Sequence, residues 1–227
     1  MFEQLKHILY ISFVVEDRYR FFLDGLYYTL LLTFTSFLLG TAVGIGLCAS
    51  LRAKNKFLNK TARVIITFFM ETPTLVLLMI LVYVIFGKTS VPLLWAVIIG
   101  LMLKAASYLA EIFDTALNTV APGEIEAART LGMTGWQAFW FVMLPQTVKA
   151  ALPLYRNQFI ATMQETSVVG YLAVVDLTRA ASIVSSRTLD AIVGLLVVTL
   201  LYFLIGLLVK ALFRLISASQ CRKGGAL

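Results

Sequence analysis

Residues 126–145 read EAARTLGMTGWQAFWFVMLP and lie between two strongly apolar regions of the chain. The stretch begins with polar and small residues, and the preceding pair Pro122-Gly123 is typical of a break in regular structure. Glu124 and Glu126 are expected in a first helical turn, because the free N–H groups there favour carboxylates. Gly132 is expected to end this helix, since glycine takes the left-handed conformation without steric cost.

A second helix is predicted directly after this turn. Thr134 and Gln137 have the Thr-x-x-Gln spacing of a capping box, in which each side chain accepts a hydrogen bond from the other residue's backbone N–H. Residues 124–135 therefore predict a short helix, a tight turn and the start of another helix, all suspended between two membrane spans.

The composition is that of a membrane protein with several spans. Of the 227 residues, 60% are hydrophobic and 14% are charged, and the mean hydropathy is +0.89. An ordinary soluble domain is less apolar and carries more charge. The sequence shows no soluble domain, long linker or internal repeat, so residues 1–227 are predicted to form a single all-α transmembrane domain.

Five spans account for the apolar regions. Residues 1–21 contain an apolar run that is short for a span and are predicted to form an interfacial segment. The fourth span is unusually polar, which predicts a central position in the bundle, shielded from lipid. The predicted spans are about 22–49, 62–86, 92–117, 146–170 and 191–213, with an outer loop, re-entrant or scooped, between the last two.

The net charge of +7 is explained by the orientation of the chain in the membrane and does not require a nucleic-acid partner. The loop from Leu51 to Arg63 carries five basic residues and no acid, and Lys210, Arg214, Arg222 and Lys223 follow the last span. Both segments are therefore predicted to be cytoplasmic. With five spans, a cytoplasmic C-terminus requires an N-terminus on the outer side.

The stretch at 126–145 resembles the EAA loop of the permease subunits of ABC importers. That pattern is Glu-Ala-Ala, three residues, Gly, nine residues, Ile, one residue and Leu-Pro. Here Glu126-Ala127-Ala128, Gly132 and Leu144-Pro145 fit every spacing, and Val142 replaces the isoleucine. The resemblance extends from about Gly25 to about Gly206 and is closest to the branch that takes up polar amino acids.

The resemblance implies a type I ABC importer permease fold with a cytoplasmic coupling helix. The chain would move a polar solute, most simply an amino acid, across a bacterial cytoplasmic membrane by alternating access. Its partners would be a pair of cytoplasmic ATPases that bind ATP and Mg²⁺, a second permease chain, the same or related, and an outer substrate-binding protein. The chain itself would be no enzyme and would bind no cofactor. The residues implied in ATPase coupling are Glu126, Ala127, Ala128, Gly132, Leu144 and Pro145.

Polar residues inside the predicted spans are the candidates for the solute pathway, because ionisable groups in a span face water or other helices. Lys104, Tyr108, Glu111 and Thr115 share one stripe of span three, which could also be structural. The resemblance adds the segment NQFIATMQETSVVG at 157–170, whose acidic residue before Thr-Ser lies beside the pathway in the amino acid permeases. The candidates are Glu71, Thr72, Pro73, Lys104, Glu111, Gln158, Thr162, Glu165, Thr166 and Ser167.

Two other classes of protein were weighed against the importer. A secondary transporter or channel acting alone would use Lys104, Glu111 and Glu165 as an ion relay, but it leaves the loop pattern unexplained. A membrane-embedded enzyme or metalloprotein would need a nucleophile–base pair or a cluster of metal ligands, and neither is visible in the sequence.

In the amino acid permeases Arg-Gly precedes the Thr-Pro of span two, where this chain has Met70-Glu71, so the charge of the solute stays open.

Overall fold

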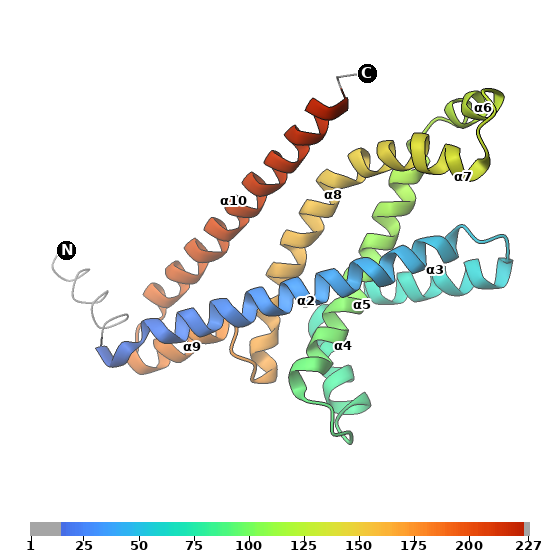
Figure 1. Ribbon diagram of the computed structural model, residues 1–227. Coiled ribbons are helices and arrows are strands. Elements are labelled where there is room, and N and C mark those ends of the chain that lie inside the picture. The colour runs from blue at the N-terminus through green and yellow to red at the C-terminus, as the bar shows by residue number, and fades with distance from the viewer. Residues whose placement is uncertain (1–14, 225–227) are drawn as a thin grey trace. The chain divides into compact units, whose positions relative to one another are not determined.

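The computed structural model describes residues 15–224, and it describes the side chains of residue 15 and of residues 17–215. All regular structure in this part of the chain is helical (Figure 1). The α-helices are α2 Tyr19–Leu51, α3 Lys56–Glu71, α4 Thr74–Met79, α5 Leu93–Asn118, α6 Pro122–Thr130, α7 Gly135–Ala138, α8 Leu144–Glu165, α9 Leu177–Thr188 and α10 Ala191–Gly224. The 3₁₀ segments are η1 Val15–Asp17 and η4 Thr166–Leu172, and the π segments are η2 Ile80–Ile85 and η3 Phe139–Met143.

Three helices are long and apolar enough to cross a membrane by themselves, namely α2, α5 and the Ala191–Leu215 part of α10. Two bent pairs of helical segments, Lys56–Glu71 with Thr74–Ile85 and Gly135–Leu172 with Leu177–Thr188, pass the same test when each pair is taken together. The described chain thus has three spans, or up to five if each bent pair is one span. Most of the predicted interfacial segment, residues 1–14, lies outside the described residues.

The second predicted span is not one continuous helix. α3 ends at Glu71, and Thr72 and Pro73 are extended, with ψ angles of 127° and 133°, before α4 begins. The cause is local, because the ring of a proline pushes the preceding residue out of the helical region and removes one N–H donor. α3 also begins earlier than predicted, at Lys56, where the side chain of Asn55 accepts a hydrogen bond from the N–H of Phe57.

The predicted outer loop before the last span is mostly the helix α9. Asp176 caps its N-terminus, since its carboxylate accepts hydrogen bonds from the N–H groups of Thr178 and Arg179, both at 3.0 Å. This carboxylate is fully buried. The prediction of a loop was wrong because the helix is short and polar on one face, and its buried residues Leu177, Ala180, Ala181 and Val184 depend on tertiary contacts for a partner.

The chain divides into two compact units, each with its own buried cluster. One unit contains the described residues up to Phe37, then Pro73–Met102 and Ile160–Val209. In it, Leu32, Leu78, Val97 and Leu101 pack with Val169 of η4. A second cluster in the same unit joins Phe22 and Val198 to the buried face of α9. The N–H of Leu177 donates to the hydroxyl of Thr29 at 3.1 Å, which ties the start of α9 to α2.

The other unit contains Leu38–Thr72, Leu103–Phe159 and the described residues from Lys210. Helices α2 and α5 approach closely within it, because Gly44 carries no side chain. A Cβ atom on Gly44 would lie 3.0 Å from the carbonyl oxygen of Ala106 and 3.0 Å from the Cβ of Leu109. The prediction that the small residues of the first span allow close helix packing is confirmed at this glycine, whereas Gly46 has open space around it.

Gly44 and Gly46 therefore form a matched pair for a test of helix packing. We expect Gly44→Leu to destabilise the protein by about 1–3 kcal/mol, because the larger side chain overpacks the contact between α2 and α5. Gly46→Leu should be close to neutral, since no described residue from another helix lies within 4 Å of its Cβ position. Thermal unfolding of the two variants in detergent measures this difference. Equal loss of stability in both would contradict the close approach.

Candidate functional site

The loop that joins α5 to α8 folds as two short helices, α6 and α7 (Figure 1). α6 begins at Pro122, two residues before the predicted first turn, and its N-cap residue Ala121 has an extended backbone. Proline suits this first position, because its missing N–H would have no partner there. Glu124 therefore lies in the first turn as predicted, whereas Glu126 lies beyond it.

Gly132 closes α6 in the predicted way. Its φ angle is +88°, in the left-handed region that favours glycine. The N–H of Met133 donates to the carbonyl of Ala128 at 3.2 Å, and the N–H of Gly132 donates to that of Arg129 at 3.0 Å. These two bonds form a Schellman motif, which satisfies carbonyls that the end of a helix leaves free.

The start of α7 confirms the predicted capping box. The N–H of Gln137 donates to the Thr134 hydroxyl at 3.3 Å, and the N–H of Thr134 donates to the Gln137 side-chain oxygen at 2.8 Å. Only Met133 lies between the glycine that closes α6 and the cap that opens α7. The turn between the two helices is therefore fixed by hydrogen bonds on both sides.

The Leu144-Pro145 pair stands where the helix changes type. The π segment η3 leads into α8, and the N–H of Leu144 donates to the carbonyl of Phe139 in the π pattern. Pro145 follows with no N–H to donate, so the wider π turn accommodates a gap in the hydrogen-bond ladder. One residue later, the Gln146 side chain donates a hydrogen bond to the carboxylate of Glu124, which joins the start of α8 to the start of α6.

The loop presents a defined set of residues at its surface. Glu126, Ala127 and Gly132 are exposed, and Leu131 is 82% exposed. Ala128 is only 5% exposed, so its small side chain serves packing within the chain and is not available to a partner. Trp136 on α7 is 70% exposed and stacks on Phe139, with ring centroids 6.4 Å apart.

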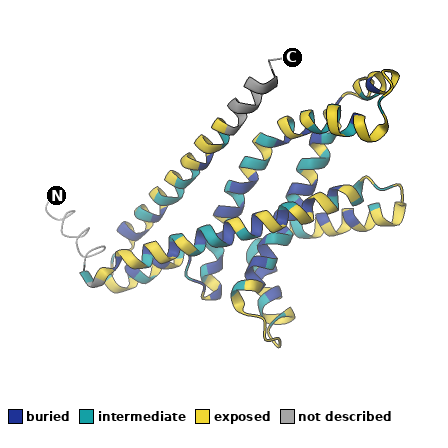
Figure 2. Cartoon of the chain, viewed as in Figure 1, coloured by how far each residue is buried: buried dark blue, intermediate teal, exposed yellow. Residues whose placement is uncertain are grey.

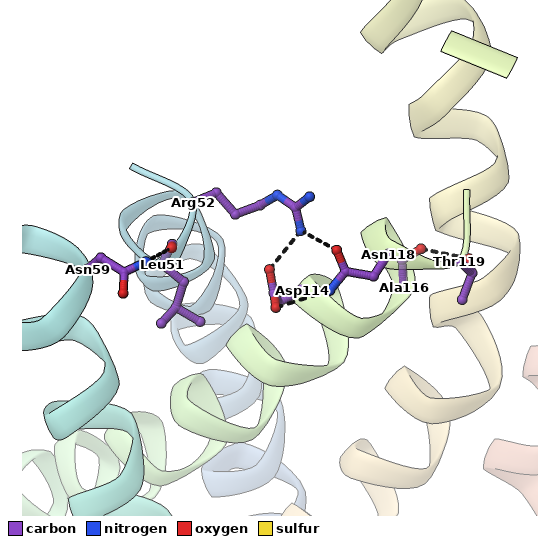
Figure 3. Close-up of polar contacts among 7 residues, drawn as sticks. All are labelled: Leu51, Arg52, Asn59, Asp114, Ala116, Asn118 and Thr119. Carbon is purple, nitrogen blue, oxygen red and sulfur yellow. Dashed lines mark hydrogen bonds and ion pairs between the residues drawn. The ribbon is translucent and has the colours of Figure 1, made fainter. Parts of the chain in front are cut away.

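A polar link that the sequence does not reveal lies beside this loop (Figure 3). Arg52, just after α2, donates one N–H to the carboxylate of Asp114 at 2.8 Å and another to the side-chain oxygen of Asn118 at 3.0 Å. Both partners lie in the last turns of α5, immediately before the loop. The sequence shows Arg52 only as one of five basic residues, because its acceptors are more than 60 positions away. The ion pair is partly exposed, so its own contribution to stability is small.

Lys104 and Tyr108 have a structural role at the break in the second predicted span. The ammonium group of Lys104 donates to the carbonyl of Thr72 at 2.7 Å, and the hydroxyl of Tyr108 donates to the carbonyl of Met70 at 3.4 Å. These carbonyls lie at the end of α3, where Pro73 interrupts the helical hydrogen bonds. Lys104 is 5% exposed, and its ammonium group also lies 6.0 Å from the centroid of the Tyr108 ring.

The other pathway candidates differ in their surroundings. Glu71 and Glu111 are exposed on the chain. Gln158 and Thr162 are buried one turn apart on α8, and the Gln158 amide nitrogen and the Thr162 hydroxyl have no hydrogen-bond partner in the described part of the chain. Buried polar atoms without a partner are uncommon, so these two groups are the most suggestive of a missing ligand, water or subunit.

The segment Glu165-Thr166-Ser167 lies where α8 ends and the 3₁₀ segment η4 begins. Thr166 is fully buried, and its hydroxyl donates to the carbonyl of Met163 at 2.7 Å. Glu165 and Ser167 are partly buried. The end of the helix therefore places one carboxylate and one further hydroxyl at a change of backbone conformation.

Replacement of Lys104 tests the capping of the broken helix. We expect Lys104→Met to destabilise the protein by about 1–3 kcal/mol, because the Thr72 carbonyl loses its donor in a partly buried position. Thermal unfolding in detergent measures the loss, with Lys149→Met, an exposed lysine of α8, as the control. Unchanged stability of the Lys104 variant would show that the carbonyl finds another donor.

The helices and the loop define a membrane permease of the class suggested by the loop pattern, and comparison with known proteins agrees. The chain belongs to the family described as the binding-protein-dependent transport system inner membrane component, whose sequence profile matches residues 36–220. The identification as an ABC importer permease subunit is confirmed by this match. The alternative of a transporter that acts without such a system loses its support.

Several curated relatives carry names of amino acid permeases. The chain is 37% identical over 173 residues to the probable amino-acid permease protein YxeN of Bacillus subtilis, covering 74% of this chain and 77% of the relative. It is 29% identical over 214 residues to the histidine/lysine/arginine/ornithine transport system permease protein HisM of Salmonella typhimurium, covering 89% of this chain and 90% of the relative.

Solved structures show the same fold. An amino acid ABC transporter crystallised with histidines is similar with a TM-score of 0.81 and 31% identity, covering 88% of this chain and 94% of that chain. The MetNI methionine ABC transporter is similar with a TM-score of 0.75 at 22% identity, which indicates the fold alone. The predicted all-α ABC permease fold is thus confirmed, while the number of spans stays between three and five.

Proposed function

We propose that this chain carries an amino acid across the cytoplasmic membrane as the permease subunit of an ATP-driven importer. The solute class is supported by the names of its relatives, which include permeases for amino acids, and by the segment at 157–170. ATP and Mg²⁺ would be bound by two cytoplasmic ATPase subunits. A second permease chain and an outer substrate-binding protein would complete the assembly, with the N-terminus outside and the C-terminus in the cytoplasm.

The observation that carries the proposal is the hydrogen-bonded closure of the loop at Gly132. α6 ends in a Schellman motif, and α7 starts in a capping box one residue later. A loop held by these hydrogen bonds can move as a rigid body when a partner displaces it. The exposed residues Glu126, Ala127 and Leu131 would meet the ATPase, and Glu126 would accept hydrogen bonds from it.

Movement of α6 has two routes into the surrounding helices of its unit. Gln146 ties α8 to Glu124 at the start of α6. Arg52 ties the end of α2 to Asp114 at the end of α5. When the two ATPases close on ATP, these links would convert their approach into a shift between two packings of the bundle. That shift is what alternating access requires.

An amino acid always carries an ammonium group, and Glu165 is the acidic residue that the family resemblance places beside the pathway. Ser167 adds a hydroxyl. The Gln158 amide nitrogen and the Thr162 hydroxyl, which have no partner among the described residues, add groups that a polar solute or water would satisfy. Buried donors and acceptors of this kind favour a polar solute over an apolar one. These groups leave the charge of the solute's side chain open.

Two substitutions in the loop test the coupling. We expect Gly132→Val to insert into the membrane and to lose at least nine-tenths of ATP-driven uptake, because a β-branched residue is strained at a φ angle of +88°. Glu126→Lys should lose the ATPase subunit during purification in mild detergent. Gly132→Asn is the matched control, since asparagine tolerates the left-handed conformation and should retain most uptake.

The measurements are uptake into reconstituted vesicles and identification of the copurified proteins by mass spectrometry. Wild-type protein should retain an ATPase subunit that the Glu126→Lys variant lacks. A wild-type chain that purifies alone or only with copies of itself would contradict the coupling role. Full uptake by Gly132→Val would contradict the need for the closed turn.

Glu165 provides the test of the solute class. We expect Glu165→Gln to lower the apparent affinity for the transported amino acid at least tenfold. The reason is that the hydrogen bond donated by the solute's ammonium group loses its charged acceptor. Radiolabelled amino acids of each charge class, supplied with the binding protein, measure this effect in vesicles. ATPase copurification should be unchanged, so failure of this test is separable from failure of the coupling test. Uptake of no amino acid by the wild type would contradict the proposed solute.

A further inference from the structure

Helix α3 shows a face that the chain itself leaves uncovered. Ala62 and Ile66 are buried, and Ile66 packs in a cluster with Cys48 and Ala110. On the opposite side, Phe57, Val64 and Phe68 are 79%, 62% and 57% exposed. Their spacing of seven and four residues places them on one stripe of the helix. Most residues of α3 are exposed, as the colouring by burial also shows (Figure 2).

A basic stripe runs beside this apolar stripe. Lys56, Lys60 and Arg63 follow one another at four and three residues, so they share a side of α3, and all three are exposed. Lys54 lies exposed in the turn just before the helix. None of these four side chains forms a hydrogen bond or an ion pair with another described residue, in contrast to Arg52, which binds Asp114.

Nothing nearby in the sequence neutralises this charge. From Leu51 to Met70 the chain has no acidic residue, and Asp114 is engaged by Arg52. Four positive charges over ten residues therefore form a surface that would attract an anionic ligand. The charge alone does not distinguish a free phosphate, an acidic protein surface and a lipid.

The apolar stripe decides between these ligands. We propose that α3 binds an anionic phospholipid, with the phosphate on Lys56, Lys60 and Arg63 and an acyl chain along Phe57, Val64 and Phe68. The apolar stripe extends over the 12 residues from Phe57 to Phe68, a rise of about 16 Å along an α-helix, which is close to half the thickness of a hydrocarbon core. A free phosphate would leave three large apolar side chains uncovered, and a purely acidic protein surface would not match them.

The physical logic is that of an amphipathic helix at a charged membrane surface. Basic side chains beside an apolar face bind anionic lipid both by attraction and by burial of the acyl chain. Lysine and arginine extend their aliphatic stems along apolar surface and keep the charge at the headgroups. The site lies outside the EAA loop and outside the pathway candidates, so a bound lipid would act on the permease independently of its solute.

The test is native mass spectrometry of the purified transporter complex, titrated with dioleoylphosphatidylglycerol or with dioleoylphosphatidylcholine. We expect wild type to bind the anionic lipid at least tenfold more tightly than the neutral one. The triple variant Lys56→Gln, Lys60→Gln, Arg63→Gln should lose this preference. A variant with Lys56→Arg and Lys60→Arg should retain it, which separates charge from folding.

The matched control removes three exposed basic residues from elsewhere, Lys88→Gln, Lys210→Gln and Arg214→Gln. It should keep the lipid preference, and an equal loss in both triple variants would overturn a specific site. Displacement of the lipid by inorganic phosphate alone would identify a phosphate site. Loss of a protein subunit from the α3 variant, with lipid binding unchanged, would identify an acidic protein surface as the occupant, and either result would overturn the proposal.

Discussion

Every backbone N–H and carbonyl group inside a bilayer must find a partner within the protein, because hydrocarbon offers none. This constraint is most visible where Pro73 interrupts the second span. The proline leaves carbonyls at the end of α3 without their usual donors, and Lys104 and Tyr108 of α5 supply replacements at Thr72 and Met70. A charged residue in an apolar helix thereby caps the end of α3 within one unit, where Pro73 separates α3 from α4.

The same requirement shapes the loop between α5 and α8. Its exposed backbone is satisfied almost wholly by local bonds: the Schellman bonds at Gly132, the capping box of Thr134 and Gln137, and the π segment before Pro145. A loop that satisfies its own backbone needs few contacts with the bundle to hold its shape. Residues such as Glu126 and Leu131 are therefore exposed for contact with another protein, while the loop keeps its conformation.

Much of the loop could be predicted from the sequence, because its determinants lie within a few residues of one another. Glycine at a left-handed position and a Thr-x-x-Gln pair are local rules. The outer helix α9 was predicted as a loop, since its buried face needs Phe22 and Val198 from distant segments. For the same reason the Arg52–Asp114 link was invisible, and Lys104 was considered for the pathway without its carbonyl partner.

The sequence by itself determined that the chain is a helical membrane protein with an EAA loop, because apolar run length, turn residues and motif spacing are properties of short stretches. Tertiary structure decided which polar side chains have hydrogen-bond partners within the chain and which do not. It placed Lys104 at a helix end and Arg52 beside Asp114, and it left the basic stripe of α3 exposed. It also buried the Gln158 amide nitrogen and the Thr162 hydroxyl with no partner among the described residues. The physical reason is that a buried polar group binds whichever partner lies near it in the folded chain. Such partners can be distant in the sequence, so residue spacing does not reveal them.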